Sequence, residues 1–289
     1  MDVTVTKEYK DRLFRLVFQD KKDLLSLYNT VNKSNYDNPE ELQILTLENM
    51  IYLKMKNDIS FLLGDILNLY EHQSTVNPNM PVRGFLYFAE MYQKYLMKYK
   101  YRLFSTKLIM LPMPQYIVFY NGLANQPDRF ELKMSDAFLP AITTTEPCLE
   151  CTALMLNINL GRNRELMEGC RKLKEYAMFV ATVREKLTLD LPFNEAVDSA
   201  IQECIRNNVL KSLLIAHRAE VINMLFTDYD EQEHMACVKE EGFEEGLISG
   251  EEKFARLIQL LIKNSRNEEI EKAVNNKDYR NQLFNEFGL

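Results

Sequence analysis

The sequence contains few of the residues that build zinc, redox and disulfide sites. It has five cysteines and three histidines in 289 residues. An odd number of scattered cysteines does not make a disulfide framework. Cys148 and Cys151 form one CxxC pair, but a structural zinc site needs four ligands and no second close pair follows. We therefore expect reduced thiols that are buried or incidental.

Long apolar runs are also lacking. No run approaches the roughly eighteen uncharged residues of a membrane span. The first residues, MDVTVTKEYKDRLFRLVF, lack the apolar stretch of a signal peptide. We expect a cytoplasmic, soluble protein with no membrane partner.

The charge balance gives no sign of a large basic surface. The chain has 42 acidic and 35 basic side chains, a formal net charge of −7, and 46% apolar residues. This composition favours a packed core and argues against an extensive basic nucleic-acid footprint. A local basic patch remains compatible with it, because net charge does not report where charges lie.

The hydrophobic pattern predicts an α/β core followed by helices. Helical spacing covers residues 8–31, and it also covers 81–99, with one apolar face. Short strands are expected at 42–47, 57–63, 66–73, 114–120 and 152–159, and Asn121-Gly122 is expected to turn the chain. The pattern from 165 to 217 is helical throughout. The apolar face of 81–99 is expected to comprise Phe85, Phe88, Ala89, Tyr92 and Leu96.

Composition changes near residue 239, where KEEGFEEGLISGEEK is charged and spaced by glycines. We expect a core at 1–160, a helical extension packed on it at 161–238, and a charged helical tail at 239–289. The C-terminal helices offer a surface for homo-oligomerisation.

Two carboxylates flank a tight turn in NDISFLLGDILNLYEHQST. A two-residue loop at Gly64-Asp65, with glycine first, predicts a type II′ hairpin. Leu63 then pairs with Ile66, and counting outward pairs Asp58 with Glu71 on one face. Like charges so placed repel, so three readings stay open. A cation lies between them, one carboxyl is protonated, or a shifted register leaves both in solvent.

Two carboxylates suit a hard cation such as Mg²⁺, or else Mn²⁺ or Ca²⁺. Such an ion can activate water and stabilise charge on a phosphodiester. Gln73 falls on the same face as Glu71, and Glu48 is a candidate third carboxylate ligand, although a turn or cap role is the commoner use of such a residue.

These residues resemble the PD-(D/E)XK nuclease signature, with Gln73 where many of these enzymes have a catalytic lysine. The blocks KNDISFLL, NLYEHQSTVNPNMPVRGFLYFAEMY, YIVFYNG and NINLGRN are similar to the recombination-promoting nuclease and putative transposase family of bacteria. The resemblance covers roughly residues 8–250. It implies a restriction-endonuclease-like core of a helix, three strands, a helix and a strand in a mixed sheet. It also implies metal-dependent DNA cleavage serving recombination, mobile elements or defence, with Asp58 and Glu71 as metal ligands.

Two further expectations concern cations. The same register pairs Lys56 with Gln73, so the ammonium of Lys56 could replace the absent lysine. The simpler interpretation is that Lys56 is a solvated residue at the end of the strand. The most basic part of the chain is expected to bind DNA phosphates. Its residues are Arg83, Lys94, Lys98, Lys100 and Arg102. The leading function is thus a metal-dependent DNA endonuclease. The alternative is a catalytically degenerate module of the same fold that binds nucleic acid or protein.

Overall fold

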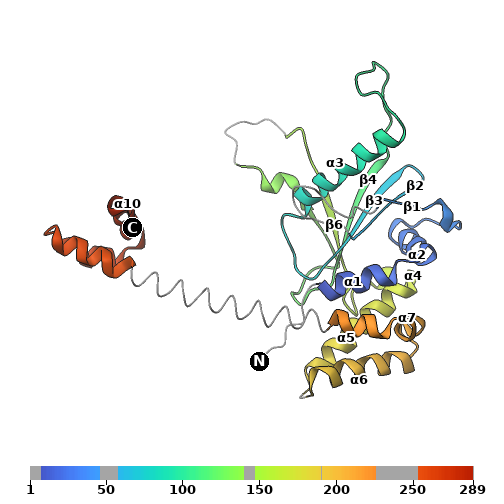
Figure 1. Cartoon of the computed structure of the whole chain (residues 1–289). Coiled ribbons are helices and arrows are strands. Elements are labelled where there is room, and N and C mark those ends of the chain that lie inside the picture. The colour runs from blue at the N-terminus through green and yellow to red at the C-terminus, as the bar shows by residue number, and fades with distance from the viewer. Residues whose placement is uncertain (1–7, 46–57, 140–146, 190, 226–252, 289) are drawn as a thin grey trace. The chain divides into compact units, whose positions relative to one another are not determined.

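The computed structural model describes residues 8–45, 58–139, 147–189, 191–225 and 253–288 (Figure 1). The chain forms two compact units, Met1–Tyr229 and Asp230–Leu289. The boundary expected near residue 239 lies outside the described residues, so the finer division of the chain stays a prediction. Among the described residues, no helix has both the length and the apolar character needed to cross a membrane.

A mixed six-stranded sheet forms the centre of the first unit. In chain order its strands are β1 (Gln43–Ile44), β2 (Ile59–Leu63), β3 (Ile66–Gln73), β4 (Met113–Tyr120), β5 (Arg129–Lys133) and β6 (Thr152–Asn157). Their order across the sheet is β1-β2-β3-β4-β6-β5. β3, β4 and β6 run parallel, and the other neighbours pair antiparallel. The α/β class is confirmed.

The hairpin between β2 and β3 has the expected register. Leu63 pairs with Ile66 and Ser60 with Leu69. Gly64 has a φ of +55°, which a first-position glycine of a II′ turn adopts without strain. All five residues of β2 are buried, as expected of a central strand.

Two helices replace the single helical stretch expected at 8–31. They are α1 (Glu8–Val17) and α2 (Lys21–Asn32), and a short 3₁₀ turn, η1 (Pro39–Glu41), follows. The side chain of Asp20 accepts a hydrogen bond of 2.8 Å from the backbone N–H of Lys22. This N-cap starts α2 and explains the break.

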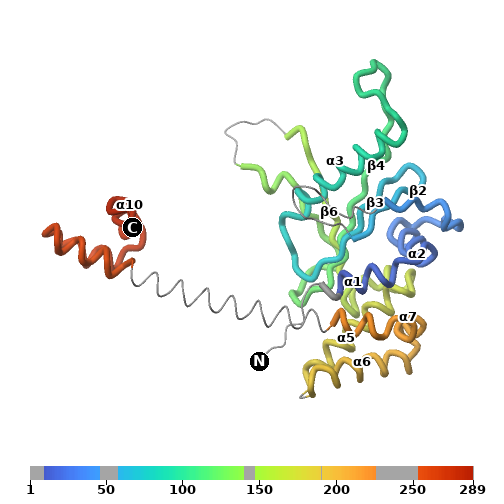
Figure 2. Tube along the Cα trace, in the orientation of Figure 1, coloured from blue at the N-terminus to red at the C-terminus, as the bar shows by residue number. Residues whose placement is uncertain are grey.

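Helices lie on both faces of the sheet (Figure 2), and each face carries a separate apolar core. α3 (Met80–Lys98) covers one face, where Leu69, Tyr116 and Val118 are buried. On the other face Tyr70 and Phe119 pack with helices that precede the sheet in the sequence and with helices that follow it. Those helices are α1, α2, α4 (Arg164–Gly169), α5 (Arg171–Leu187), α6 (Phe193–Arg206) and α7 (Lys211–Ala216).

The apolar face expected for α3 is confirmed only in part: Phe88 is buried and Tyr92 packs against the same core. Phe85 and Ala89 are exposed, whereas Gly84, Tyr87 and Met91 are buried. Gly84 faces the sheet at close range. A Cβ at this position would lie 2.4 Å from Cε1 of Tyr116, so only glycine allows this approach. Glycine adds nothing to an apolar pattern, so the pattern missed the Gly84 side of the buried face.

Two other expectations about the chain path need correction. Asn121-Gly122 does not close a turn; Asn121 is buried, and its N–H donates to the carbonyl of Gln73 at 2.9 Å. β5 was not expected at all, and a 3₁₀ turn, η2 (Met134–Ala137), follows it.

The second unit is helical within residues 253–288. Residues 253–263 form a helix, followed by α9 (Glu268–Asn275) and α10 (Lys277–Phe287). They enclose a small core of Leu257, Leu261, Ala273 and Leu283.

Candidate metal centre

Glu71 is a buried carboxylate near the end of β3, on the face covered by α3. Its side chain is 1% exposed. Oε2 accepts a hydrogen bond of 3.0 Å from the hydroxyl of Tyr116 and lies 3.4 Å from Nη2 of Arg83. Oε1 has no hydrogen-bond partner among the described residues. Half of this carboxylate therefore has no compensating group, which is costly for a buried acceptor.

Asp58 directly precedes β2, at the same end of the hairpin. Its Oδ2 accepts a hydrogen bond of 2.7 Å from the backbone N–H of His72, and its Oδ1 lies 3.8 Å from Nε of Arg15. The side chain is 14% exposed. The hairpin thus brings both acids to one end of the sheet.

Burial raises the pKa of both carboxyls. It raises the pKa of Asp58 to about 6, and the nearby charge of Asp11 adds to the effect, although the His72 N–H and Arg15 oppose it. Burial likewise raises the pKa of Glu71 to about 7; Arg83 opposes this rise and the charge of Asp58 reinforces it. The two acids therefore lie within electrostatic reach, in surroundings with too little positive charge to neutralise both.

His72 points to the opposite face and connects three elements. Its Nδ1 lies 2.6 Å from Oδ1 of Asp11 on α1, and its Nε2 lies 2.9 Å from the Tyr176 hydroxyl on α5. Burial lowers the pKa of His72 to about 3, so the ring is neutral. A carboxylate only accepts, so Nδ1–H donates to Asp11, and the Tyr176 hydroxyl, which has one hydrogen, lies within hydrogen-bond distance of both Nε2 and the carbonyl of Lys10. This chain of polar groups fixes the β3 backbone whose N–H holds Asp58.

The residues expected to bind DNA lie in two places: Arg83 near the start of α3, and Lys94, Lys98, Lys100 and Arg102 at and beyond its end. Arg83 lies in the centre itself, within reach of Glu71 and 3.4 Å from the hydroxyl of Tyr87. Lys94 pairs with Glu90 at 3.0 Å, and Lys98 donates to Oε1 of Gln43 at 3.1 Å. The helical rise separates Arg83 from Lys98 by about 22 Å.

Gln73 is half-buried at the end of β3, whereas Lys56 and Glu48 lie outside the described residues. Side chains alternate between the two faces along a strand, so Gln73, two residues after Glu71, lies on the same face. Its amide can orient a substrate oxygen but cannot carry a proton.

Sequence reasoning missed Asp11, Arg15 and Tyr116. Asp11 and Arg15 lie four residues apart, a spacing that places them on one side of α1. That spacing was the available signal for two charges on the sheet-facing side of this helix. Tyr116 gave no signal, since its contact with Glu71 joins residues far apart in sequence.

The described residues contain no group of three or more His, Cys, Asp or Glu side chains arranged to hold a metal ion. A cation here would rest on Asp58 and Glu71, with water and substrate oxygens completing its shell, as Mg²⁺ sites commonly do. The Glu71 oxygen without a partner and the two raised pKa values fit such an ion. Cys148 and Cys151 are free thiols.

Comparisons of the chain with protein-family models, with curated proteins and with solved structures found no match.

Proposed function

We propose that this protein is a metal-dependent DNA endonuclease whose centre is formed by Asp58 and Glu71. The observation that carries the proposal is their placement at one end of a buried hairpin, with Oε1 of Glu71 lacking a partner among the described residues. Two carboxylates kept close in a dry environment are the donor set for a hard cation.

The order of elements supports the same proposal. Apart from the additional helix α2 and the turn η1 before β1, the elements α1, β1 to β3, α3 and β4 follow the order of a helix, three strands, a helix and a strand. This is the order expected for the restriction-endonuclease-like core, with β3 parallel to β4. Fold likeness alone does not assign chemistry, so the centre has to carry the function.

The roles of the residues follow from their chemistry. Asp58 and Glu71 would hold Mg²⁺ or Mn²⁺, which when bound supplies an activated water and neutralises charge developing on the phosphodiester. Gln73 would orient a phosphate oxygen or the attacking water. The proposed roles of Lys56 as a substitute cation and of Glu48 as a third ligand remain predictions.

Cleavage of supercoiled plasmid DNA tests the proposal, with Mg²⁺, Mn²⁺, Ca²⁺ or a chelator present. We expect cleavage by the intact chain with Mg²⁺ or Mn²⁺, and loss of it in Asp58→Ala and Glu71→Ala. Glu165→Ala is the matched control, since Glu165 is 83% exposed and lies on α4. Cleavage retained in Glu71→Ala would place the active site elsewhere.

One observation favours a second function, a non-catalytic binding module. Arg83 and Tyr116 both contact Oε2 of Glu71, so the protein already stabilises the carboxylate that a metal would need. The neutral amide of Gln73 also lacks the charge that a lysine would bring to the phosphate. Absence of cleavage with every metal, on single- and double-stranded DNA, would favour this module.

A further inference from the structure

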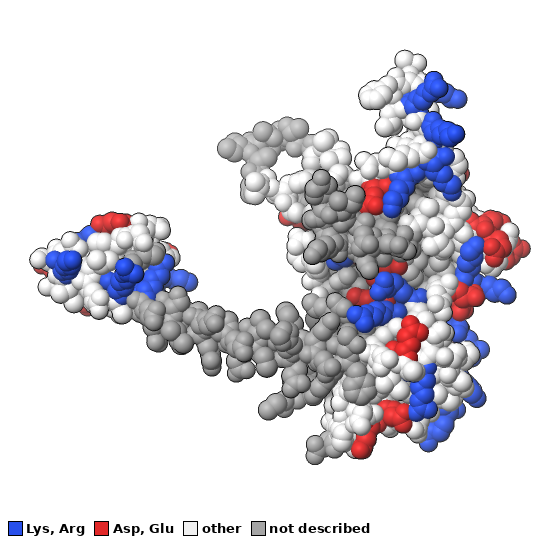
Figure 3. Space-filling view, viewed as in Figure 1, with Lys and Arg blue, Asp and Glu red and all other residues white. Residues whose placement is uncertain are grey.

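The end of α3 and the segment after it form a basic and aromatic projection. The sequence KYKYR, Lys98 to Arg102, alternates cations with tyrosines, and residues 91–127 contain no acidic side chain although the whole chain carries −7. Figure 3 shows Lys and Arg gathered along this projection. An anionic partner is therefore complementary to it.

The tyrosines of this projection form a cluster. The rings of Tyr95 and Tyr101 are stacked with centroids 6.1 Å apart, and Tyr99 lies 4.7 Å from Tyr95. Tyr99 and Tyr101 remain 45% and 41% exposed, and Nζ of Lys98 lies 5.4 Å from the centre of the Tyr99 ring. Exposed ring surface beside cations is the arrangement that binds unpaired bases and their phosphates together.

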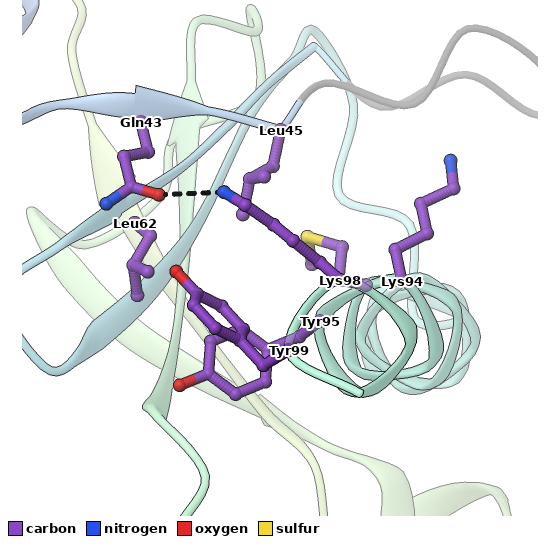
Figure 4. A pocket seen from close by; sticks show the side chains of 8 residues that line it. Gln43, Leu45, Leu62, Lys94, Tyr95, Lys98 and Tyr99 are labelled. Atoms are coloured by element: carbon purple, nitrogen blue, oxygen red, sulfur yellow. Dashed lines mark hydrogen bonds between the residues drawn. The ribbon is translucent and has the colours of Figure 1, made fainter. Parts of the chain in front are cut away.

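A pocket opens beside this cluster, between α3 and the edge of the sheet (Figure 4). Leu45, Leu62 and Met91 supply its apolar wall, and Tyr95, Tyr99 and Lys98 line the side toward the helix end. Lys98 reaches across it to Gln43. A base entering here would meet apolar surface and a ring, with an ammonium near its phosphate.

The projection lies far from the carboxylates. Arg83 contacts Glu71 near the start of α3, while Lys98 ends the helix, about 22 Å away. β3 runs in the same sense, since Ile66 pairs with Met113 near the projection and Glu71 lies toward the other end. The two surfaces are therefore separate.

We propose that Lys98, Tyr99, Lys100, Tyr101 and Arg102 bind single-stranded DNA. This inference rests on the proposed function for its substrate. DNA held at both surfaces would have an unpaired segment next to the duplex that is cut, with the cut about six base pairs from the unpaired segment, at 3.4 Å per pair.

Single-stranded DNA fits this surface better than a duplex or a lipid bilayer. Each nucleotide has one phosphate and one base, which matches alternating cations and rings. A duplex hides the flat faces of its bases, so exposed rings would gain little from it. A bilayer favours cations around a continuous apolar face, whereas here Lys98 and Lys100 lie between the tyrosines. The same segment carries five apolar side chains that are each at least 65% exposed, and these make anionic lipid the alternative to test: Met97, Leu103, Phe104, Leu108 and Met110.

Fluorescence anisotropy tests the inference without requiring catalysis. The intact chain in EDTA is titrated against labelled oligothymidylate about twelve nucleotides long, within the range bound by single-strand binding sites. We expect Tyr99→Ala and Tyr101→Ala each to weaken binding about tenfold, and Tyr99→Phe to keep it. Lys98→Gln with Lys100→Gln should reduce the slope of log affinity against log salt by about 1.4. Lys174→Gln, an exposed lysine of α5, should match the wild type.

Two results would overturn the inference. The first is binding by both tyrosine variants at wild-type affinity, which would leave only a phosphate-binding patch. The second is displacement of the oligonucleotide by vesicles of phosphatidylserine and phosphatidylcholine, which would identify a lipid surface. Asp58→Ala should still bind the oligonucleotide. If the wild type and its variants bind the oligonucleotide but none of them cleaves DNA, the nuclease proposal is refuted and the single-strand surface remains.

Discussion

Replacing Glu71 with glutamine should make the metal-free protein more stable at neutral and alkaline pH. The substitution keeps the size and shape of the side chain and removes the charge. Glu71 is 1% exposed, and Oε1 has no hydrogen-bond partner among the described residues. An ionised carboxylate there is costly, whereas a neutral amide is less so.

The sign follows from the direction of the pKa shift. Burial raises the pKa of Glu71 from 4.5 to about 7, so the folded protein holds this proton when the unfolded chain has lost it. The stability contributed by this group is complete below about pH 4.5 and is lost as pH rises through about 7. At about 1.4 kcal/mol per pKa unit, the wild type should lose about 2 kcal/mol of unfolding free energy between pH ~5.5 and pH ~8 through this group. Glu71→Gln should not show that loss.

Urea unfolding of both proteins at several pH values, in EDTA, measures the difference. Tyrosine fluorescence can follow it, because the chain has fifteen tyrosines and no tryptophan. Subtracting the two profiles cancels contributions from groups that do not interact with Glu71. Glu165→Gln, an exposed control, should have the wild-type profile. A variant less stable than wild type at pH ~8 with an unchanged pH profile would mean that Glu71 is a structural ion-pair partner of Arg83.

Three other substitutions test the surroundings of the centre. Tyr116→Phe removes the hydroxyl that donates to Glu71 and should cost about 1–3 kcal/mol near pH 8, less near pH 5.5, by urea unfolding; an equal cost at both would contradict the role of the carboxylate. Gly84→Ala puts a Cβ 2.4 Å from the Tyr116 ring and should cost about 1–3 kcal/mol, whereas Ala89→Gly, at an exposed position of α3, should cost only the helix propensity of about 1 kcal/mol. Gln73→Lys should leave plasmid cleavage unchanged or raise it, because a cation near the scissile phosphate stabilises developing charge; a fall in rate would argue against Gln73 facing the phosphate.

The hairpin could be predicted because local chemistry determines it. A two-residue loop beginning with glycine fixes which residues of the two strands pair, so the register follows from the turn alone. The positions of Asp58 and Glu71 followed from that register, without information from the rest of the fold.

Features that depend on tertiary packing were not predictable in this way. β5, RFELK, is half exposed and gains its pairing from β6. The rotation of α3 depends on the contact of Gly84 with Tyr116. Asp11 reaches His72 across 61 positions of sequence, because α1 packs against β3. Each of these contacts joins two segments that are distant in sequence, and the local sequence of one segment gives no information about the other.

Direct binding of Mn²⁺ tests the central claim that Asp58 and Glu71 form a divalent-cation centre. Electron paramagnetic resonance of free Mn²⁺, titrated into the intact chain near pH 8, reports binding whether or not DNA is cut. We expect one site in the wild type, binding at least tenfold weaker in both Asp58→Asn and Glu71→Gln, and unchanged binding in Glu165→Gln. Equal Mn²⁺ binding by wild type, Asp58→Asn and Glu71→Gln, or none by the wild type, would contradict the claim.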